Sequence, residues 1–290
     1  MSDNGRGAGP DFIEALARGL DVLRSFRPAC PSMTLSEIAA ATGLARPTVR
    51  RILITLESLG YVRAVGRGHT LTPRVLELGM AYVNALNMWD VARPHMEKLV
   101  AQTNESTSMA QLDGSDIVYV ARVAVPKIVT LGVTIGTRFP APATSMGKVL
   151  LAALPPDTLE AVLAEPSRSG ITPRWQPAPG ELDAVLREVR AKGWALADQD
   201  LAPGIRSVAT GVRDGDGRVV AAINVTVHAA ETSLETLREE HLPRLLRAAA
   251  DIGHDWALTA AVPVVTAQPS FGLAGASGSL GATRTPDRMS

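Results

Sequence analysis

The fold of the N-terminal part is decided by the stretch LSEIAAATGLARPTVRRILITLESLGYV, residues 35–62. It predicts a short helix over 35–41 and, after a glycine, a longer helix over 47–59 whose apolar residues share one face. Thr34 stands three residues before Glu37, the pattern of a capping box at the start of the first helix. Two helices joined by a tight turn are typical of a helix-turn-helix.

The flanking sequence extends this unit in both directions. An amphipathic helix is predicted to begin at Phe12, because apolar residues recur there at spacings of three and four. Two β-type runs, 61–65 and 69–72, follow around a turn that contains Gly66 and Gly68. We therefore expect a winged helix-turn-helix domain over residues 11–73, a module suited to docking on DNA.

Charge supports this interpretation locally. The chain has 29 basic and 29 acidic residues, a balance that ordinarily argues against a nucleic-acid partner. Between residues 46 and 74, however, six arginines face the single acid Glu57. The first residues of the second helix reach base edges in such domains, and the wing contacts the backbone or the minor groove. The candidate DNA-binding residues are Thr34, Arg46, Pro47, Thr48, Arg50, Arg51, Arg63 and Arg67. The alternative is a solvated helix face in a purely structural domain.

The rest of the chain predicts a linker and a second domain. We expect a linker helix over 74–88, a second domain over 89–258, and disordered tails over 1–10 and 259–290, which are rich in small and polar residues. The second domain alternates strand-like and helical patterns and is α+β in class. Its predicted strands are 117–121, 194–197, 207–212 and 219–227, and its predicted helices are 146–154, 182–192 and 234–256.

Composition excludes several classes of protein. No stretch approaches the roughly 18 consecutive apolar residues of a membrane helix, and the N-terminus lacks the apolar core of a signal peptide. We therefore expect a cytoplasmic protein without a membrane partner. The single cysteine, Cys30, excludes an intrachain disulfide and a cysteine-clustered zinc site, and the five histidines show no metal-ligand spacing. We predict no metal and no cofactor.

One motif raises the possibility of an enzyme. Ser145 and Lys148 fit the S-x-x-K pattern of penicillin-recognising enzymes, yet no Ser-Asp-Asn or Lys-Thr-Gly element accompanies them. We interpret Ser145 as a helix N-cap instead. Gly147 and Lys148 also resemble part of a phosphate loop, but Val149 stands where Ser or Thr must hold magnesium. We expect no enzymatic activity, with a serine enzyme fused to a DNA-binding domain as the rival.

Other features point to a small ligand. The helix that begins near Ser145 can attract a carboxylate through its free N–H groups and its dipole. Asn224 and Thr226 are two residues apart and share one sheet face, where they could orient a ligand together with Ser207. An exposed sheet face is the alternative.

Several motifs in order resemble one family. LARGLDVLRSF and the stretch 35–62 are similar to the winged-helix domain of the IclR family of bacterial transcription regulators. TRFPAPATSMGKVLLAALP, GWALADQDLAPGIRSVATGV and GRVVAAINVTVHA resemble its effector-binding signatures, so the resemblance runs from about Phe12 to Trp256. These segments are most similar in sequence to the subgroup that governs protocatechuate, 4-hydroxybenzoate and β-ketoadipate catabolism.

The resemblance implies a GAF-like effector-binding domain, and homodimers or homotetramers that bind a palindromic operator in double-stranded DNA. The effector would be a small carboxylic acid. Carried over by position, its contacts fall on Ser145, Met146, Ala197, Ser207, Asn224 and Thr226. Many members have an acidic residue at the place of Ala197. Arg138 and Arg206 are further basic candidates for the carboxylate. A second rival is a constitutive DNA-binding protein that senses no ligand.

Overall fold

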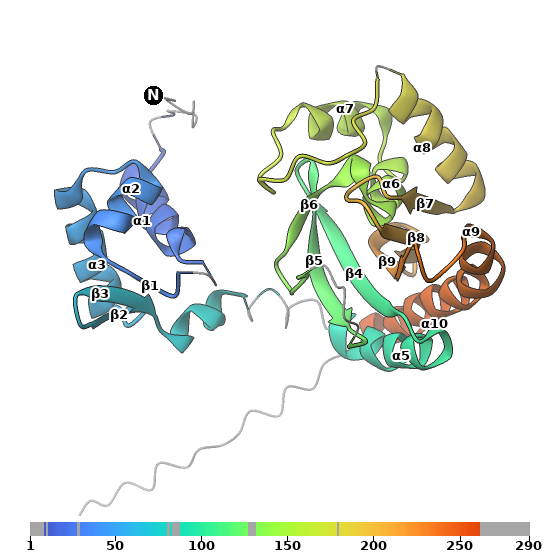
Figure 1. Cartoon of the computed structure of the whole chain (residues 1–290), viewed down its shortest axis with the longest axis horizontal. Coiled ribbons are helices and arrows are strands. Elements are labelled where there is room, and N and C mark those ends of the chain that lie inside the picture. The colour runs from blue at the N-terminus through green and yellow to red at the C-terminus, as the bar shows by residue number, and fades with distance from the viewer. Residues whose placement is uncertain are drawn as a thin grey trace, which may run out of the picture.

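The computed structural model describes residues 9, 11–27, 30–79, 82, 88–126, 132–178 and 180–261. Within these ranges the chain forms a small N-terminal domain of helices with a narrow sheet, and a larger domain built on a wide sheet (Figure 1). Both predicted tails fall almost entirely outside the described residues. Part of the predicted linker helix also lies outside them, namely residues 80, 81 and 83–87, whereas 74–79, Tyr82 and Met88 are described.

The N-terminal domain is a winged helix-turn-helix, as the sequence predicts. Its helices are α1 (Glu14–Ser25), α2 (Leu35–Thr42) and α3 (Arg46–Ser58), and a 3₁₀ turn η1 (Pro73–Val75) follows the wing. The wing strands β2 (Val62–Val65) and β3 (Gly68–Leu71) pair in antiparallel fashion, and a two-residue strand β1 (Ser32–Met33), which the sequence pattern did not indicate, joins β3.

Local signals explain why α2 and α3 form where predicted. Thr34 caps α2 in a full capping box: the Glu37 carboxylate accepts from the Thr34 backbone N–H at 2.7 Å, and the Glu37 N–H donates to the Thr34 hydroxyl. Gly43 ends α2 in the left-handed region, at φ 68°. The three helices then bury Val22, Ile38 and Leu53 in a common core.

The larger domain is organised around a six-stranded antiparallel sheet. The strand order is β6-β5-β4-β9-β8-β7, so the first strand of the domain in sequence, β4, pairs with the last, β9. The strands are β4 (Ser106–Asp113), β5 (Asp116–Val123), β6 (Arg138–Pro140), β7 (Trp194–Asp198), β8 (Ile205–Arg213) and β9 (Val219–His228).

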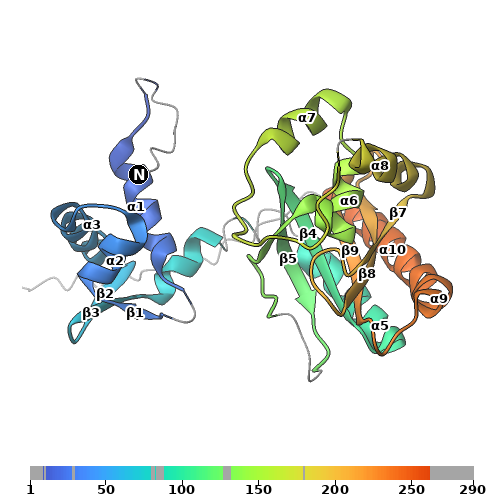
Figure 2. The same ribbon diagram turned by 45° about the horizontal axis from the view of Figure 1, so that its top comes forward.

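Helices cover both faces of this sheet (Figure 2). The long helices α5 (Met88–Thr103) and α10 (Leu242–Ala261) pack on one face around Met96, Ile223 and Leu245. The short helix α6 (Ser145–Ala152) packs on the other face, with α8 (Glu181–Lys192) beside it. The remaining turns and helices are η2 (Ala141–Ala143), α7 (Pro156–Ala164), α9 (Leu234–Thr236) and the π-helical turn η3 (Leu237–His241).

The structure differs from the sequence-based expectation at β4, β6 and α7 and in the helix predicted over 234–256. The sequence did not indicate β4, because the serines and threonines of this buried strand resemble a polar loop. It did not indicate β6 or α7 either. The single helix predicted over 234–256 is interrupted by η3, just before Pro243, whose nitrogen cannot donate a helical hydrogen bond.

A β-bulge between β4 and β5 positions the site. Met109 pairs with Ala121, but the next residue, Ala110, pairs with Tyr119, so Val120 is an extra residue on β5. Val120 and Ala121 consequently both pack towards α5 and α10. Side chains normally alternate along a strand, so residues 119 and 122 would point to opposite faces. The bulge brings both to the face that α6 covers.

Candidate functional site

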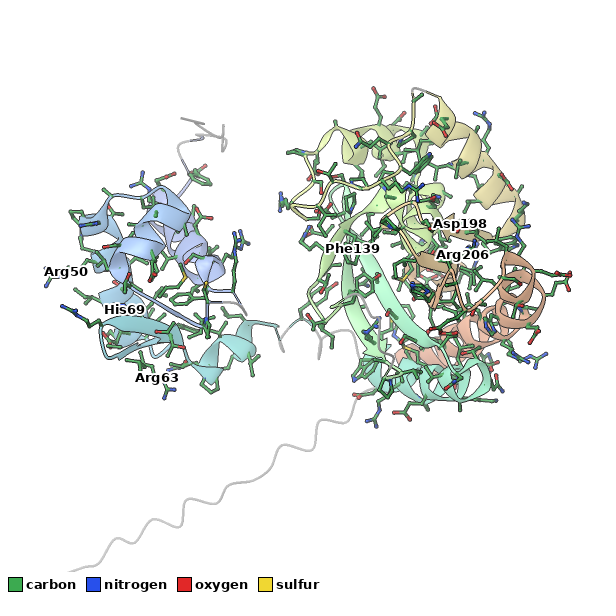
Figure 3. All side chains as sticks on the ribbon, in the orientation of Figure 1. Arg50, Arg63, His69, Phe139, Asp198 and Arg206 are labelled. Carbon is green, nitrogen blue, oxygen red and sulfur yellow. The ribbon has the colours of Figure 1, made fainter. Side chains whose placement is uncertain are left out.

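The outer face of α3 carries two of the predicted DNA-binding arginines. Arg46 and Arg50 are exposed and lie four residues apart, one above the other on the helix surface. Figure 3 shows Arg50 at the rim of the domain, extending into solvent. Pro47 occupies the first turn of α3 and is also exposed. No acidic residue stands in this first turn, so the surface is basic.

The other predicted residues of this helix face a different direction. Thr48 and Arg51 line a groove between α3 and α1, together with apolar residues such as Leu20 and Ile52. Thr34 lies at the start of α2, where its hydroxyl is occupied by Glu37. The predicted set therefore does not share one surface.

The wing supplies the remaining arginines. Arg63 on β2 and Arg67 at the tip of the hairpin are both exposed. Figure 3 shows Arg63 pointing outward from the edge of the domain. The turn at Gly66 has a φ of 59°, which favours glycine and keeps the hairpin tight.

A pocket opens on the α6 face of the large sheet. It lies between β5, the ends of β8 and β9, and the turn that precedes α6. Of the predicted effector contacts, Ala197, Ser207, Asn224 and Thr226 line it. The other residues on its wall are Glu105, Ser106, Tyr119, Arg122, Val133, Ala143, Thr144, Asp200, Leu201, Ile205, Val227 and His228.

Asn224 and Thr226 share one face of β9, as the spacing predicts, and are fixed to each other. The Asn224 carboxamide accepts from the backbone N–H of Ser108 at 3.1 Å and donates to the Thr226 hydroxyl at 3.0 Å. Thr226 pairs in register with Ser207 on β8. These polar groups are buried or half-buried, so the alternative of an exposed sheet face is wrong.

Ser145 and Met146 lie behind the pocket rather than on its wall. Both are fully buried, and the Ser145 hydroxyl is 2.7 Å from that of Ser207. The interpretation of Ser145 as the N-cap was wrong by one residue: Thr144 caps α6 by accepting from the Gly147 N–H at 2.9 Å. Thr144 has the extended backbone that an N-cap requires, and Ser145 is already helical.

Lys148 and Gly147 serve the packing of the domain. The Lys148 ammonium bonds Asp200 at 2.5 Å and the Leu196 carbonyl at 3.3 Å, and lies 4.6 Å from the centre of the Trp175 ring. A side chain at Gly147 would lie 2.0 Å from the Ala141 carbonyl oxygen, so only glycine lets α6 approach η2 this closely. The resemblance to a phosphate loop is explained by packing.

The two further basic candidates are held in ion pairs away from the pocket wall. Arg206 pairs with Asp198 at 2.5 Å and also donates to the carbonyls of Ala229 and Thr232, and Figure 3 shows Asp198 and Arg206 beside each other. Arg138 pairs with Asp113 at 2.6 Å and with the buried Asp116 at 3.4 Å.

Among the pocket residues that sequence reasoning did not find, Tyr119 and Arg122 have distinctive surroundings. Arg122 is half-buried and donates to the Ser108 hydroxyl at 2.9 Å, and its burial lowers the pKa of the guanidinium. Tyr119 is buried against Phe139 in an edge-to-face contact, and burial raises the pKa of its hydroxyl to about 12 although Arg122 acts in the opposite direction. No sequence signal placed them together, because the bulge at Val120 is visible only in the register.

The described part of the chain contains no cluster of three or more His, Cys, Asp or Glu side chains suited to a metal ion. Within the same ranges, no helix combines the length and the apolar character needed to cross a bilayer.

Comparison with known proteins places both domains. Residues 15–66 match the IclR helix-turn-helix domain, and residues 80–254 match the family described as bacterial transcriptional regulator IclR, C-terminal. The chain belongs to the IclR family. It is therefore a DNA-binding transcription regulator with an effector domain of the IclR type.

Among curated relatives of this IclR-family chain is the Pca regulon regulatory protein of Pseudomonas putida, 39% identical over 84% of each chain. The p-hydroxybenzoate hydroxylase transcriptional activator of Acinetobacter baylyi is 29% identical over 83% of this chain and 91% of the relative. These relatives are transcription regulators by name.

Solved structures agree. A transcriptional regulator from Rhodococcus sp. RHA1 is 49% identical, with a TM-score of 0.74 over 86% of this chain and 100% of the other. An IclR homologue from Microbacterium hydrocarbonoxydans, solved in complex with 4-hydroxybenzoate, is 26% identical, with a TM-score of 0.72 over 84% of this chain and 99% of the other.

Proposed function

We propose that this IclR-family regulator senses a small aromatic carboxylic acid in the pocket of its C-terminal domain and controls genes for aromatic-acid catabolism. The observation that carries the proposal is the pocket itself, a partly apolar cavity with a few buried polar groups, the usual form of a small-molecule site. The names of the Pca relatives and the 4-hydroxybenzoate complex of a homologue support an aromatic acid.

Within this pocket we assign the effector wall to Ala197, Ser207, Asn224 and Thr226, with Thr144 in place of Ser145 and Met146. The Thr226 hydroxyl accepts from Asn224, so its own hydrogen can be donated to a ligand oxygen. Many members of the family have an acidic residue at the position of Ala197, where the pocket wall of this chain is a methyl group.

We assign base contacts to Arg46, Pro47 and Arg50, and backbone contacts to Arg63 and Arg67. Arginine suits bidentate pairing with guanine, whereas wing arginines neutralise phosphates and reach the minor groove. Exposure on one outer face of α3 supports the first set, and exposure along the wing supports the second.

We further propose that the regulator acts as a homodimer or homotetramer in the cytoplasm, on a palindromic operator. One winged helix makes few base contacts, so a specific site needs two copies. Exposed apolar side chains gather on α1 and just after η1, including Leu16, Leu20 and Leu78, and line the groove beside α3. A second copy would bury them.

The rival of a serine enzyme is disfavoured by two contacts. The Ser145 hydroxyl is hydrogen-bonded to Ser207, and the Lys148 ammonium is bound to Asp200, so neither group serves the other. A nucleophile and its base need to be hydrogen-bonded to each other.

The deciding experiment is operator binding with and without 4-hydroxybenzoate and 3,4-dihydroxybenzoate, followed by recovery of the acid. A sensor changes its operator affinity or its DNA-bound geometry and returns the acid unchanged. Turnover that is abolished by Ser145→Ala would establish the enzyme, and identical operator binding under all conditions would establish a constitutive DNA-binding protein.

A further inference from the structure

We propose that Tyr119 and Arg122 form the subsite that binds the carboxylate of the effector, on the β5 side of the pocket. This inference rests on the proposed function, since it requires an acidic effector in that pocket. It places the acid on a strand that the sequence did not implicate, rather than at the N-terminus of α6.

Arg122 is a half-buried cation that has no matching anion among the residues that the structure describes. Its side chain reaches the pocket wall, and its one hydrogen bond within the described residues is to the neutral hydroxyl of Ser108. No described carboxylate forms an ion pair with it, whereas Arg138 pairs with two and Arg206 with one. Burying a charge is costly unless it is paired. A ligand carboxylate would supply the missing partner in bidentate geometry.

Tyr119 adds a hydroxyl donor on the same face. The residue is 7% exposed, lines the pocket and has no hydrogen-bond partner for its hydroxyl among the described residues. Its raised pKa of about 12 keeps the phenol protonated at physiological pH, so it can donate to an anion. The bulge at Val120 is what places this donor and the guanidinium together.

The other charged groups on the wall fix the orientation of the ligand. Asp200 follows β7, at the far side of the sheet from β5, and is bound to Lys148. Glu105 precedes β4 and accepts from Thr232 at 3.4 Å. Neither carboxylate offers a ligand anion a partner, so Arg122 is the attractive position for it on this wall. The N-terminus of α6 is less suitable, because Thr144 already occupies the Gly147 N–H.

A ring that is held by its carboxylate at β5 extends across the pocket towards β8. A hydroxyl on its opposite end would then face Ser207 and Thr226, which are paired in register, and Asp200, which can accept a hydrogen bond. The subsite therefore selects for a charged acid at one end and a neutral hydroxyl at the other.

Calorimetry with a matched pair of ligands tests this directly. 4-Hydroxybenzoate and 4-hydroxybenzamide share the ring and the hydroxyl and differ in the charge at the other end. We expect the wild-type chain to prefer the acid by at least about tenfold, as a charge-assisted hydrogen bond allows. In Arg122→Met the two ligands should bind equally, and Tyr119→Phe should weaken the acid alone. Arg138→Met, whose arginine is in an ion pair, should keep the preference. Equal loss for both ligands in Arg122→Met, or no loss, overturns the proposal.

A second measurement needs no effector. An arginine without a counterion costs stability, so Arg122→Met should leave the melting temperature of the ligand-free protein unchanged or raise it when it is made in a Ser108→Ala background, where no buried hydroxyl loses its partner. Arg138→Met should melt lower, because it leaves the buried Asp116 without its cation. A clear drop for Arg122→Met in the Ser108→Ala background would show a structural role of the guanidinium and would contradict the proposal. If the wild type binds neither 4-hydroxybenzoate nor 3,4-dihydroxybenzoate, the proposed function is wrong. The melting experiment alone then decides whether Arg122 is a cation that awaits an anionic ligand.

Discussion

The hydroxyl oxygens of Ser145 and Ser207 lie 2.7 Å apart in a position where both side chains are buried. The contact joins the first turn of α6 to β8, directly behind the pocket wall. The sequence assigned both serines to ligand binding. Ser145 instead supports the pocket from behind, by holding Ser207 in place.

Ser145→Ala should lower the stability of the effector domain. The change leaves the buried Ser207 hydroxyl without its partner, which costs about 1 to 3 kcal/mol. All four tryptophans lie in this domain, so fluorescence during urea unfolding reports on it alone. Thr172→Ala, at an exposed hydroxyl, is the control and should leave the midpoint unchanged. An unaffected midpoint for Ser145→Ala would show that the contact is not formed in solution.

Asp200→Asn should destabilise the same domain more strongly. Lys148 has a 6% exposed side chain, so removing the charge of its partner leaves a buried cation, at a cost of about 3 kcal/mol. The double variant Lys148→Met/Asp200→Leu removes both charges and should recover much of this loss. Urea unfolding of this double variant and of the single variants Lys148→Met and Asp200→Leu gives the three losses, and a loss in the double variant that equals the sum of the other two would show that the residues are not coupled.

Arg50→Ala and Arg67→Ala should affect DNA binding in different ways. Loss of a base contact at Arg50 should cost about 1 to 3 kcal/mol at the operator and relax its sequence preference. Loss of a phosphate contact at Arg67 should weaken binding to all DNA sequences. It should also lower the slope of log affinity against log salt concentration by about 1. Arg187→Ala, an exposed arginine on α8, is the charge-matched control. Fluorescence anisotropy at several salt concentrations separates these outcomes, and operator affinity that survives Arg46→Ala/Arg50→Ala would refute the assignment of this face.

Tyr119 should make the free energy of unfolding depend on pH in the alkaline range. Its pKa is raised from 10.0 to about 12 by burial, so between these values the unfolded chain releases a proton that the folded chain keeps. Stability therefore falls as pH rises from about 10 towards 12. Tyr119→Phe lacks this group, so the difference in urea midpoint between the two proteins should shrink or reverse in favour of the variant over that interval. A constant difference would mean that Tyr119 is not buried.

Leu16→Glu should disrupt assembly. Leu16 is 61% exposed on α1 beside the groove with α3, and burying a charge at a contact between copies is unfavourable. Sedimentation should show a dimer or tetramer for the wild type and a smaller species for the variant, with weaker operator binding. Ile171→Glu, at an exposed apolar residue of the effector domain, is the control. A wild-type monomer that binds a single half-site tightly would contradict the proposed assembly.

The sequence predicted the helix-turn-helix well because its signals are local. The capping box of Thr34 and the left-handed Gly43 set the limits of α2 without help from the rest of the chain. The N-cap of α6 was misplaced by one residue because Thr144 and Ser145 are equally suited to the role, and the choice depends on how η2 packs against Gly147.

The pocket could be predicted only in part. Asn224 and Thr226 follow from strand periodicity, since polar residues two apart share a face, whereas Ser207 and Ala197 were assigned through the family resemblance. Arg138 and Arg206 satisfied the sequence criteria for an anion partner, but their acids come from other segments and are visible only in space. Arg122 was missed because periodicity across Val120 assigns it to the opposite face from Tyr119.

That extra residue in β5 bears on how sensing proteins of this kind diverge. Insertion or loss of one residue at the position of Val120 would rotate Arg122 out of the pocket while every pocket side chain stayed the same in type. Two homologues with identical side chains at the aligned positions could then respond to different metabolites. Effector preference in such a lineage is inherited through strand register as well as through residue identity, and a comparison restricted to the residue types at the pocket positions does not record the former.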